Sequence, residues 1–421
     1  MPDKLQQFDL IVCGGGMVGA SLVVALLPAA EQLGLRIALI EQNALPTVAN
    51  PEYQPSFDAR STALAAGSRT LLETMGVWSA LAEHLTPIKE IEVSAKGQFG
   101  RTQMQAEREQ VPALGYVVEN HWMGQVLMSH IQQVDSPQIE FFSPATVRSI
   151  SPAMPLSEVI IESEGVTQTL SAPLVVMADG GRSELRLAMG IDYSEQDYHQ
   201  HALVANVALD RPHEGVAYER FTEQGPIALL PIESADGQAR MGLVWTVFEE
   251  RIDQVMALDD AAFLEELQGA FGFRAGALTR VGERFSYPLK LILAQEQART
   301  GLVVLGNAAH SLHPIAGQGF NLAIRGVAQL AELVIARKKA GQALGDLAAL
   351  QTFVEQRRAD QQRTIRFGDS SLKLFMSRNP AVRLGRSLGL QLLDLIPPAR
   401  TLLARAAMGL DTPAARLNPD D

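Results

Sequence analysis

Glycines gather beside polar residues at three widely separated points of this 421-residue chain, each directly after a short apolar run. The three points are Gly14 to Gly19, Asp179-Gly180, and Gly306 to Gly319. Glycine lets the main chain approach a ligand closely because it has no Cβ. The N–H groups at a helix start attract negative charge. Glycine-bearing turns that lead into helices therefore predict a site for an anionic ligand such as a dinucleotide.

The first point has the most specific pattern. Gly14-Gly15-Gly16-Met17-Val18-Gly19 fits G-x-G-x-x-G, between an apolar run at 8–13 and a helix predicted at 20–33. A second buried strand is predicted at 36–40 and closes with Glu41, at the spacing where an acid accepts a ribose hydroxyl. We expect the glycines at a pyrophosphate and Glu41 at the ribose. The alternative is a glycine-rich turn in another kind of α/β unit.

The last point is a strand, a loop and a helix start. Val303 to Leu305 is apolar, Gly306-Asn307 follows, and a helical pattern runs from Asn321 to Ala336. Pro314 and Gly317-Gln318-Gly319 lie in the intervening loop. The helix start would stabilise the negative N1–C2=O edge of a reduced flavin. The alternative is a strand-to-helix loop that uses glycine only for its turn geometry.

The middle point follows a buried strand predicted at 174–178. Asp179-Gly180 and then Ser183 lead from that strand into another helix. An acid and a glycine at a strand end are typical of the carboxyl edge of an open sheet, where ligands bind in such folds. The alternative is an Asp-Gly turn with Ser183 as the helix cap, and this segment alone favours the alternative.

Composition bounds the class of protein. A net charge of −12 argues against nucleic-acid binding, which needs basic patches. The single cysteine, Cys13, excludes an internal disulfide and a cysteine metal cluster, and its place in the first strand predicts a small core residue. We therefore expect no metal and a reducing, cytoplasmic compartment. We also expect no membrane-spanning helix, because no uncharged apolar run is long enough, and no targeting peptide before Gly14.

Further elements must position these turns. We expect a surface loop at 45–57, a helix after Ser61 that stops at Gly76, a strand region from 91–93, a helix at 122–134 and short strands over 139–170. The first of these helices should carry Leu64, Leu71, Leu72 and Met75. Strands at 202–209, 216–221, 227–230 and 241–248, with a helix near 261–271, predict an inserted antiparallel sheet. This sheet should form a wall over the ligand, with Phe221, Pro226 and Leu230 as candidate lining.

The chain is expected to be helical past Lys339. Residues 376–409 carry five arginines against a single acid, Asp394, among many leucines. The arginines are Arg378, Arg383, Arg386, Arg400 and Arg405. One interpretation is a helix that docks on a membrane surface or a partner protein. The other is a helical lid packed on its own protein with solvated arginines, and the two stay open.

The three motifs together resemble those of the flavin-dependent aromatic hydroxylases related to p-hydroxybenzoate hydroxylase. That family carries an amino-terminal G-x-G-x-x-G, a central Asp-Gly with Ser and Arg beyond it, and a late Gly-Asp-Ala-Ala-His followed by P-x-x-G-x-G-x-N. The central motif is matched by Asp179, Gly180, Ser183 and Arg186, and the late one by Gly306 to His310, Pro314, Gly317, Gly319 and Asn321. The resemblance covers most of the chain up to Lys339.

More closely, FDARSTALAAGSR, GVWSAL, YERFTEQGPIALLP and SYPLKL resemble the ubiquinone-biosynthesis branch of this family, in particular the 2-octaprenyl-6-methoxyphenol hydroxylases. Asn307 departs from the aspartate of the wider family, which is expected to bond the ribityl chain of FAD. Asparagine can still donate or accept a hydrogen bond there, without the charge. We interpret Asn307 as a mark of the subfamily.

The resemblance implies an α/β fold: a Rossmann-like FAD-binding domain of the glutathione-reductase type, an inserted antiparallel-sheet substrate domain and a helical C-terminus. The FAD-binding domain would comprise 1–85, 113–190 and 291–345. The substrate domain would comprise 86–112 and 191–290, and the C-terminal helical region 346–421. Because the substrate would come from a bilayer, peripheral attachment to the inner membrane or to a biosynthetic complex through 376–421 is a further expectation.

The resemblance also implies the reaction. NAD(P)H reduces FAD, dioxygen adds at flavin C4a, and the distal oxygen of that hydroperoxide passes to the ring of a prenylated phenol, of the 2-polyprenyl-6-methoxyphenol type. The flavin carries the chemistry, so no catalytic residue is assigned, and neither His310 nor His313 receives a role. Arg60 and Gln125 would lie beside the cofactor, and Asp179 and Gly180 would serve FAD, with the nicotinamide donor as a further candidate. Asn307, after Gly306, would reach the ribityl or pyrophosphate region, and Gly317 to Asn321 would meet the isoalloxazine.

Four alternatives accompany this interpretation. The chain could hydroxylate another ring position or a soluble aromatic. It could be a flavin halogenase, which is disfavoured because none of Trp78, Trp122 and Trp245 lies in a W-x-W-x-I-P-like run. It could be a flavin-carrying scaffold subunit of a biosynthetic complex. It could be an NAD dehydrogenase, which would lack the visible absorbance of bound FAD.

Overall fold

The computed structural model describes residues 6–45, 60–97, 101–180, 185–312, 317–376 and 415–420. Pro314, His313, Ser183, most of the loop expected at 45–57, and all five arginines of the 376–409 segment lie outside the described residues.

A six-stranded sheet carries the glycine-bearing turns. Its order is β20-β21-β13-β2-β3-β9, and all neighbours are parallel except the antiparallel edge strand β20. The strands are β2 (Leu10–Cys13), β3 (Ile37–Ile40), β9 (Ile139–Phe142), β13 (Leu174–Met177), β20 (Ala298–Arg299) and β21 (Leu302–Val304). The three central strands are entirely buried, as expected for continuous apolar runs covered on both faces.

Two layers cover this sheet. On one face, Leu10 and Val12 pack with α1 (Met17–Leu33), α4 (Asn120–Val134) and α8 (Gln318–Lys339). On the other face, Ile11 and Cys13 pack with a four-stranded sheet. That sheet has the order β1 (Gln6–Gln7), β12 (Val166–Ala172), β11 (Ser157–Ser163) and β10 (Thr146–Ser151). Cys13 is fully buried, which confirms its predicted place in the core.

A three-stranded sheet corrects one prediction. Residues after Ser61 form β4 (Ser61–Ala65) and not a helix, so Leu64 is a strand residue. β4 pairs residue for residue with β8 (Gly115–Glu119), which also pairs with β5 (Thr86–Ile88). Helix α2 (Ala66–Thr74) begins only where that ladder ends, and α3 (Trp78–Ala82) follows Gly76. Long-range pairing therefore overrides the helical pattern of the apolar residues at this position.

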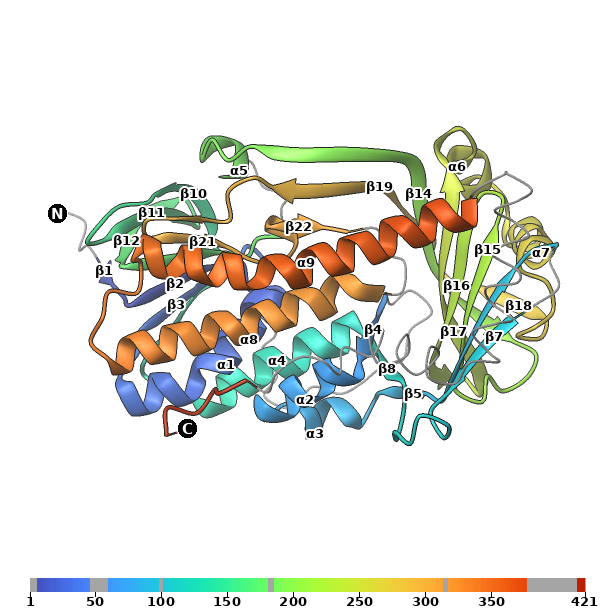
Figure 1. The fold of residues 1–421 in the computed structure, drawn as a ribbon, viewed down its shortest axis with the longest axis horizontal. Helices are drawn as coiled ribbons and strands as arrows, with labels where there is room; N and C mark the ends of the chain where they lie inside the picture. Colours follow the sequence, from blue (N-terminus) through green and yellow to red (C-terminus); the bar gives the residue numbers. More distant parts are fainter. Residues whose placement is uncertain are drawn as a thin grey trace.

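The largest sheet stands at the other end of the molecule (Figure 1). Its order is β22 (His310–Ser311), β19 (Phe285–Ala294), β14 (Tyr193–Leu209), β17 (Gln238–Phe248), β16 (Gly225–Ala235), β15 (Val216–Thr222), β6 (Glu90–Ala95) and β7 (Arg101–Gln105), with β18 (Leu278–Val281) paired to β14. Helices α6 (Glu249–Met256) and α7 (Asp260–Phe271) cover its outer face. The strands are longer than predicted, and α6 was not predicted.

A buried ion pair joins the large sheet to the three-stranded sheet. Arg240 of β17 donates through Nη2 to Glu119 of β8 at 3.0 Å, and its Nε donates to the Glu233 carbonyl at 2.7 Å. Arg240 is fully buried and Glu119 is 4% exposed. Because both charges are removed from water, each depends on the other for compensation.

The described C-terminal residues, 347–376 and 415–420, comprise one long helix and a short irregular segment. Helix α9 (Leu347–Met376) runs over α8 towards the large sheet, where it contacts β15 and β16 (Figure 1). The short helix α5 (Leu185–Ala188) lies earlier in the chain, directly before β14. Residues 415–420 are not helical, which corrects the prediction of helix to the end of the chain. Leu417 is buried in the cluster that contains α1 and α8, so this segment packs on its own protein.

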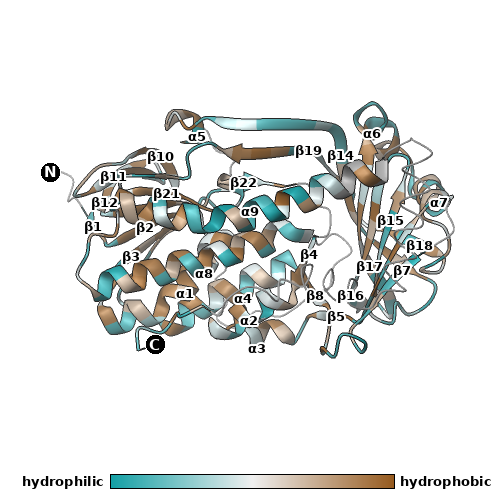
Figure 2. Ribbon diagram, viewed as in Figure 1, coloured by the Kyte–Doolittle hydropathy of each residue, from teal (hydrophilic) through white to brown (hydrophobic). Residues whose placement is uncertain are grey.

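Hydropathy follows these layers. The large sheet and α8 are rich in apolar residues, whereas polar residues interrupt α9 along its length (Figure 2). Helix α8 is long and apolar enough to cross a membrane by composition alone. Its apolar side chains pack against α1 and the six-stranded sheet, so packing in the core accounts for its hydropathy.

Candidate active site

The three glycine-bearing turns meet at one edge of the six-stranded sheet. Gly14 N–H donates to the Ile40 carbonyl, Ala178 N–H to the Cys13 carbonyl, and Leu305 N–H to the Met177 carbonyl, each at 2.9 Å. All of these strands are parallel, so their carboxyl ends lie together. The structure therefore brings together the turns that the sequence placed far apart.

Glycine is required where these turns touch. Gly14 has φ +108°, and a Cβ there would lie 2.7 Å from the Ala178 carbonyl oxygen. Gly306 has φ +66°, and a Cβ there would lie 2.9 Å from Cγ2 of Val18. Side chains at either position would force the three turns apart, so these glycines serve the fold of the site as well as any ligand.

The start of α1 fits a bound pyrophosphate. Gly16 caps the helix without a side-chain hydrogen bond, and a Cβ at Gly16 would meet no atom within 4 Å. The neighbouring Gly15 N–H donates to Oε2 of Glu41 at 2.8 Å. The result is an open helix start beside a carboxylate, which can hold a phosphate group and accept a ribose hydroxyl. This cradle is the feature that fits a dinucleotide such as FAD.

Asp179 lies in the same edge. It follows β13 and is half-buried, while Gly180 is exposed with φ +81°. Burial, together with the nearby charge of Asp179, raises the pKa of the Cys13 thiol, which places that carboxylate beside the end of β2. Asp179 is therefore where the sequence placed it, beside the glycine-rich turn.

The turn after β21 accepts a hydrogen bond from Tyr193, a residue that was not predicted from the sequence. Tyr193 donates its hydroxyl to the Ala308 carbonyl at 3.0 Å, and the Arg186 guanidinium lies 4.8 Å from the centre of its ring. Asn307, one residue earlier, is exposed to the edge. A tyrosine so far along the chain gives no local sequence signal for this contact.

The start of α8 lies against β4. Gly317 caps the helix in the left-handed conformation with φ +59°, and a Cβ there would lie 3.1 Å from that of Ala63. Gly319 borders open space, since a Cβ there would meet no atom within 4 Å. This helix also lacks a side-chain cap, so it offers a second helix start to a ligand.

Asn321 fixes that helix start from inside. Its Oδ1 accepts from Ala65 N–H at 2.8 Å and from the Ser68 hydroxyl at 2.7 Å. Its Nδ2 donates to the carbonyls of Ala63 at 2.9 Å and Gly317 at 2.8 Å. Protein groups thus use the whole side chain, and Asn321 positions the loop instead of offering a free amide to the cofactor.

Arg60 directly precedes β4, and Gln125 lies in α4, the helix that follows β8. Arg60 is exposed and donates through Nη1 to the Tyr287 hydroxyl of β19 at 2.9 Å. It therefore joins the segment that leads into β4 to the large sheet. Gln125 lies half-buried in the second turn of α4. Asn120, at the start of that helix, donates its N–H to the Arg60 carbonyl at 2.8 Å, which links the two predicted positions.

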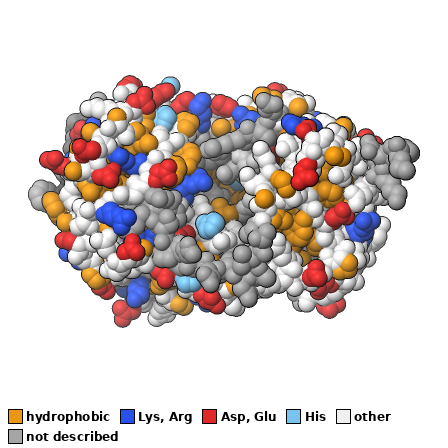
Figure 3. Space-filling model, turned by 180° about the vertical axis from the view of Figure 1, so that it is seen from behind, with side chains coloured by type: hydrophobic (Ala, Val, Ile, Leu, Met, Phe, Trp, Pro, Cys, Tyr) orange, Lys and Arg blue, Asp and Glu red, His pale blue; other side chains and the backbone are white. Residues whose placement is uncertain are grey.

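The inner face of the large sheet forms a wall opposite these loops. Strand register places Val204, Val244 and Ala228 side by side on the face that carries Arg240. All three are partly exposed, whereas Leu203, Leu229 and Leu243 on the outer face are buried by α6 and α7. The predicted lining residues Phe221, Pro226 and Leu230 share the inner face. Seen from behind, the surface is hollowed between the large sheet and the cofactor layers (Figure 3).

One carboxyl group interrupts this apolar wall. Glu219 of β15 pairs with Ala228 and therefore points to the inner face. The residue as a whole is partly exposed, but its carboxyl group lies deep enough that burial raises its pKa from the ordinary value to about 7. The sequence reasoning missed Glu219, although the alternating pattern of β15 contained the signal.

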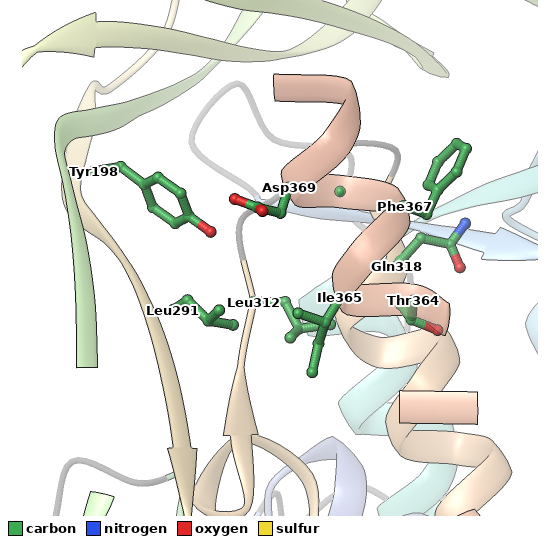
Figure 4. A pocket seen from close by; sticks show the side chains of 9 residues that line it. Tyr198, Leu291, Leu312, Gln318, Thr364, Ile365, Phe367 and Asp369 are labelled. Atoms are coloured by element: carbon green, nitrogen blue, oxygen red, sulfur yellow. The ribbon is translucent and has the colours of Figure 1, made fainter. Parts of the chain in front are cut away.

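A small cavity adjoins the start of α8. Leu291, Leu312 and Ile365 lie along one side of it, and the Tyr198 hydroxyl and Asp369 carboxylate face each other across it (Figure 4). Burial, and then the charge of Asp369, raises the pKa of Tyr198. The cavity measures about 20 Å³, which holds about one water. It is too small for an aromatic ring.

His310 is buried behind the cofactor loop. It is 2% exposed, and burial, reinforced by the charge of Arg357, lowers its pKa to about 4. Arg357 of α9 fits only because residue 326 is glycine, and it donates to the Leu322 carbonyl at 3.2 Å. His310 is therefore neutral at physiological pH, which does not suit it to exchange protons with a ligand. Among the described residues, no cluster of His, Cys, Asp and Glu could hold a metal ion.

Comparisons with known proteins agree with this geometry. The FAD binding domain family matches residues 7–368. Ubiquinone hydroxylase UbiL of Rhodospirillum rubrum is 34% identical over 95% of this chain and 89% of its own length. 3-Demethoxyubiquinol 3-hydroxylase of Escherichia coli is 29% identical over 96% of this chain and 99% of its own length. The crystal structure of p-nitrophenol 4-monooxygenase from Pseudomonas putida superposes with a TM-score of 0.76 at 18% identity, over 98% of this chain and 99% of that one.

Proposed function

Because the chain belongs to the FAD-binding-domain family of flavin-dependent aromatic hydroxylases, we propose that it hydroxylates the ring of a polyprenylated phenol in ubiquinone biosynthesis. The substrate would be of the 2-polyprenyl-6-methoxyphenol type. Relatives whose names describe ubiquinone hydroxylases cover nearly the whole chain and support the pathway. The observation that carries the proposal is the apolar inner wall that faces the flavin loops across a hollow.

The residues of the chain hold the cofactor and exclude water. FAD, once bound, supplies the redox chemistry with NAD(P)H and dioxygen. The start of α1 and Glu41 hold the pyrophosphate and ribose, while the start of α8, fixed by Asn321, meets the ring system. The buried Arg240–Glu119 pair keeps the wall at a fixed distance from these loops. Because the wall and the loops are fixed relative to each other, a ring bound between them is held in one orientation, which lowers the entropic part of the activation barrier.

The wall also favours a substrate with an apolar tail. Val204, Val244, Ala228 and Leu230 expose aliphatic surface towards the hollow. Burying each methylene of a prenyl chain there contributes about 0.8 kcal/mol. A soluble aromatic acid would gain little from this surface and would need a cationic partner. Arg240, a cation that the register places on this face, is fully buried and already paired with Glu119.

Access from a bilayer is part of the proposal. The arginine and leucine mixture of 376–409 has the composition of a segment that binds an anionic membrane surface. Liposomes with anionic lipids should sediment the wild-type protein and not a variant with Arg378, Arg383, Arg386, Arg400 and Arg405 changed to glutamine. This variant leaves the buried Leu417 segment intact, so loss of binding would not reflect unfolding of the tail end.

Product analysis tests the activity. FAD-loaded protein should oxidise NADPH faster when a short-chain 2-prenyl-6-methoxyphenol is added, and the product should carry one more ring hydroxyl. A matched phenol without the prenyl group should react with a higher KM, because it gives up the apolar contact. Equal kcat/KM for both phenols, or flavin reduction without a hydroxylated product, would contradict the proposal.

A further inference from the structure

The inner wall of the large sheet carries a carboxyl group, that of Glu219, which could accept a hydrogen bond from a hydroxyl. Glu219 lies on β15 between Val93 of β6 and Ala228 of β16, by strand register. Its neighbours along β15 on the same face are Ala217 and Phe221, both buried. A carboxyl among aliphatic side chains costs free energy unless something binds it.

No described residue compensates Glu219. None of them donates a hydrogen bond to it or forms an ion pair with it. Two charged residues close to Glu219 on β15 and β6 lie on the outer face: Arg220 donates to the Ser94 hydroxyl at 3.3 Å, and Glu92 pairs with Arg274 at 2.7 Å. The neighbouring positions on the inner face of β6 and β16 are apolar.

Helix α9 also contacts β15 and β16, and it carries Arg363, Arg366 and Asp369 near its C-terminal end. Burial raises the pKa of Glu219 to about 7, and no ion pair joins these described α9 residues to it. The carboxyl group is therefore enclosed by apolar groups but open to the hollow. That combination is what a ligand with a single hydrogen-bond donor would complete.

We infer that Glu219 binds the phenolic hydroxyl of the substrate, so that it orients the ring against the wall and fixes which ring carbon faces the flavin. This inference rests on the proposed function, because it assigns the hydroxyl of that substrate to one residue. A hydrogen bond from the phenol to an ionised carboxylate is stronger than one between neutral groups. It also draws the O–H bond towards the carboxylate and makes the ring more electron-rich, as attack by an electrophilic oxygen requires.

Ionisation of Glu219 then controls phenol binding. A carboxyl with a pKa of about 7 is neutral below that pH and accepts only weakly. If the ionised form alone binds the phenol, affinity should rise about tenfold between about pH 6 and about pH 8. The phenol itself, with a pKa near that of tyrosine at about 10, stays protonated throughout this range.

Equilibrium binding to the FAD-loaded protein tests this. The probes are 2-methoxy-6-prenylphenol and its methyl ether, which lacks the donor, and the readout is the change in flavin absorbance. Wild type should prefer the phenol by about tenfold at about pH 8, and that preference should fall with pH. Glu219→Gln should bind both probes about equally, without pH dependence. Glu219→Asp should keep a pH-dependent preference. An unchanged preference in Glu219→Gln would overturn the inference.

A measurement on wild type alone covers the case in which variants lose FAD. Calorimetric titration with the phenol at about pH 7, in two buffers of different ionisation enthalpy, should show release of about half a proton, and the methyl ether should release none. No proton release would overturn the role of Glu219. Hydroxylation of the phenol by that same protein would leave the proposed function intact, whereas failure to bind any phenol would overturn both.

Discussion

Asn321 accepts a hydrogen bond from the hydroxyl of Ser68 at 2.7 Å, across 253 residues of chain. The same side chain bonds Ala65, Ala63 and Gly317, so one amide ties β4 and α2 to the start of α8. Protein groups alone therefore fix the start of α8, which we predict to lie at the flavin ring.

Replacing this amide should unfold the site. Asn321→Ala leaves two carbonyls and two donors without a partner in a buried place, so the free energy of unfolding should fall by about 3 kcal/mol. Urea unfolding of the FAD-free protein measures this. Asn307→Ala, at an exposed position of the same motif, is the matched control and should change stability by less than about 0.5 kcal/mol. Equal losses in both variants would contradict the structural role of Asn321.

Substitutions at two glycines of the first turn should distinguish an effect on stability from an effect on FAD affinity. Gly16→Ala adds a methyl group into open space at φ −63°, so the FAD-free protein should keep its stability. If the pyrophosphate lies there, FAD affinity should fall by at least about tenfold, equal to about 1.4 kcal/mol. Flavin fluorescence titration and thermal melting of the FAD-free protein give both values.

Gly14→Ala is the contrasting variant. Its Cβ would meet the Ala178 carbonyl at 2.7 Å, and its φ of +108° disfavours alanine. Stability of the FAD-free protein should therefore fall together with FAD binding. Gly16→Ala protein that binds FAD as tightly as wild type would show that the start of α1 is not the phosphate site.

The pair of Arg240 and Glu119 should be coupled. Arg240→Met strands the buried Glu119 carboxylate and should cost about 3–5 kcal/mol. The double variant Arg240→Met/Glu119→Leu removes both charges and should recover most of that loss. Denaturant unfolding of the single and double variants forms a cycle, and additive losses would mean that the two residues act independently.

His310 predicts a pH dependence of stability. Its pKa in the folded protein is about 4, below the ordinary 6.5, so the unfolded chain binds the proton more readily. Above about pH 6.5, His310 is neutral in both states and the free energy of unfolding is at its full value. As the pH falls from there towards about 4, protonation of His310 in the unfolded chain lowers that free energy by about 3 kcal/mol in total. His310→Asn should flatten the fall in the free energy of unfolding between about pH 7 and about pH 5. The same slope in wild type and variant would contradict this assignment.

Much of the nucleotide-binding part could be predicted from the sequence, because its signals are local. The G-x-G-x-x-G lies between a buried strand and a helix that are adjacent in the chain, and α1 spans Met17–Leu33 despite Pro28. Glu41 closes the next strand and reaches the loop. In a βαβ unit these neighbours in sequence are also neighbours in space, so order along the chain sufficed.

The parts that were wrong or missed depend on distant partners. Leu64 belongs to a strand because β8, about fifty residues later, supplies the ladder. Asn321 was predicted to lie beside the cofactor, and its hydrogen bonds to β4, α2 and Gly317 are a structural role that the sequence did not predict. The face to which Glu219 points follows from the pairing of β15 with β16 and from the helices on the outer face. The first two contacts leave no periodic pattern in their own segments, and the alternation of β15 separates two faces without indicating which one is the inner face.

Oxygen transfer tests the account most directly. FAD-loaded protein should be mixed with NADPH, a short-chain 2-prenyl-6-methoxyphenol and dioxygen labelled with the heavy oxygen isotope, and the product analysed by mass spectrometry. We predict a ring-hydroxylated product with one labelled oxygen atom, formed only when the prenylated phenol is present. Consumption of NADPH with no labelled phenol, from protein shown to be folded and saturated with FAD, would contradict the account.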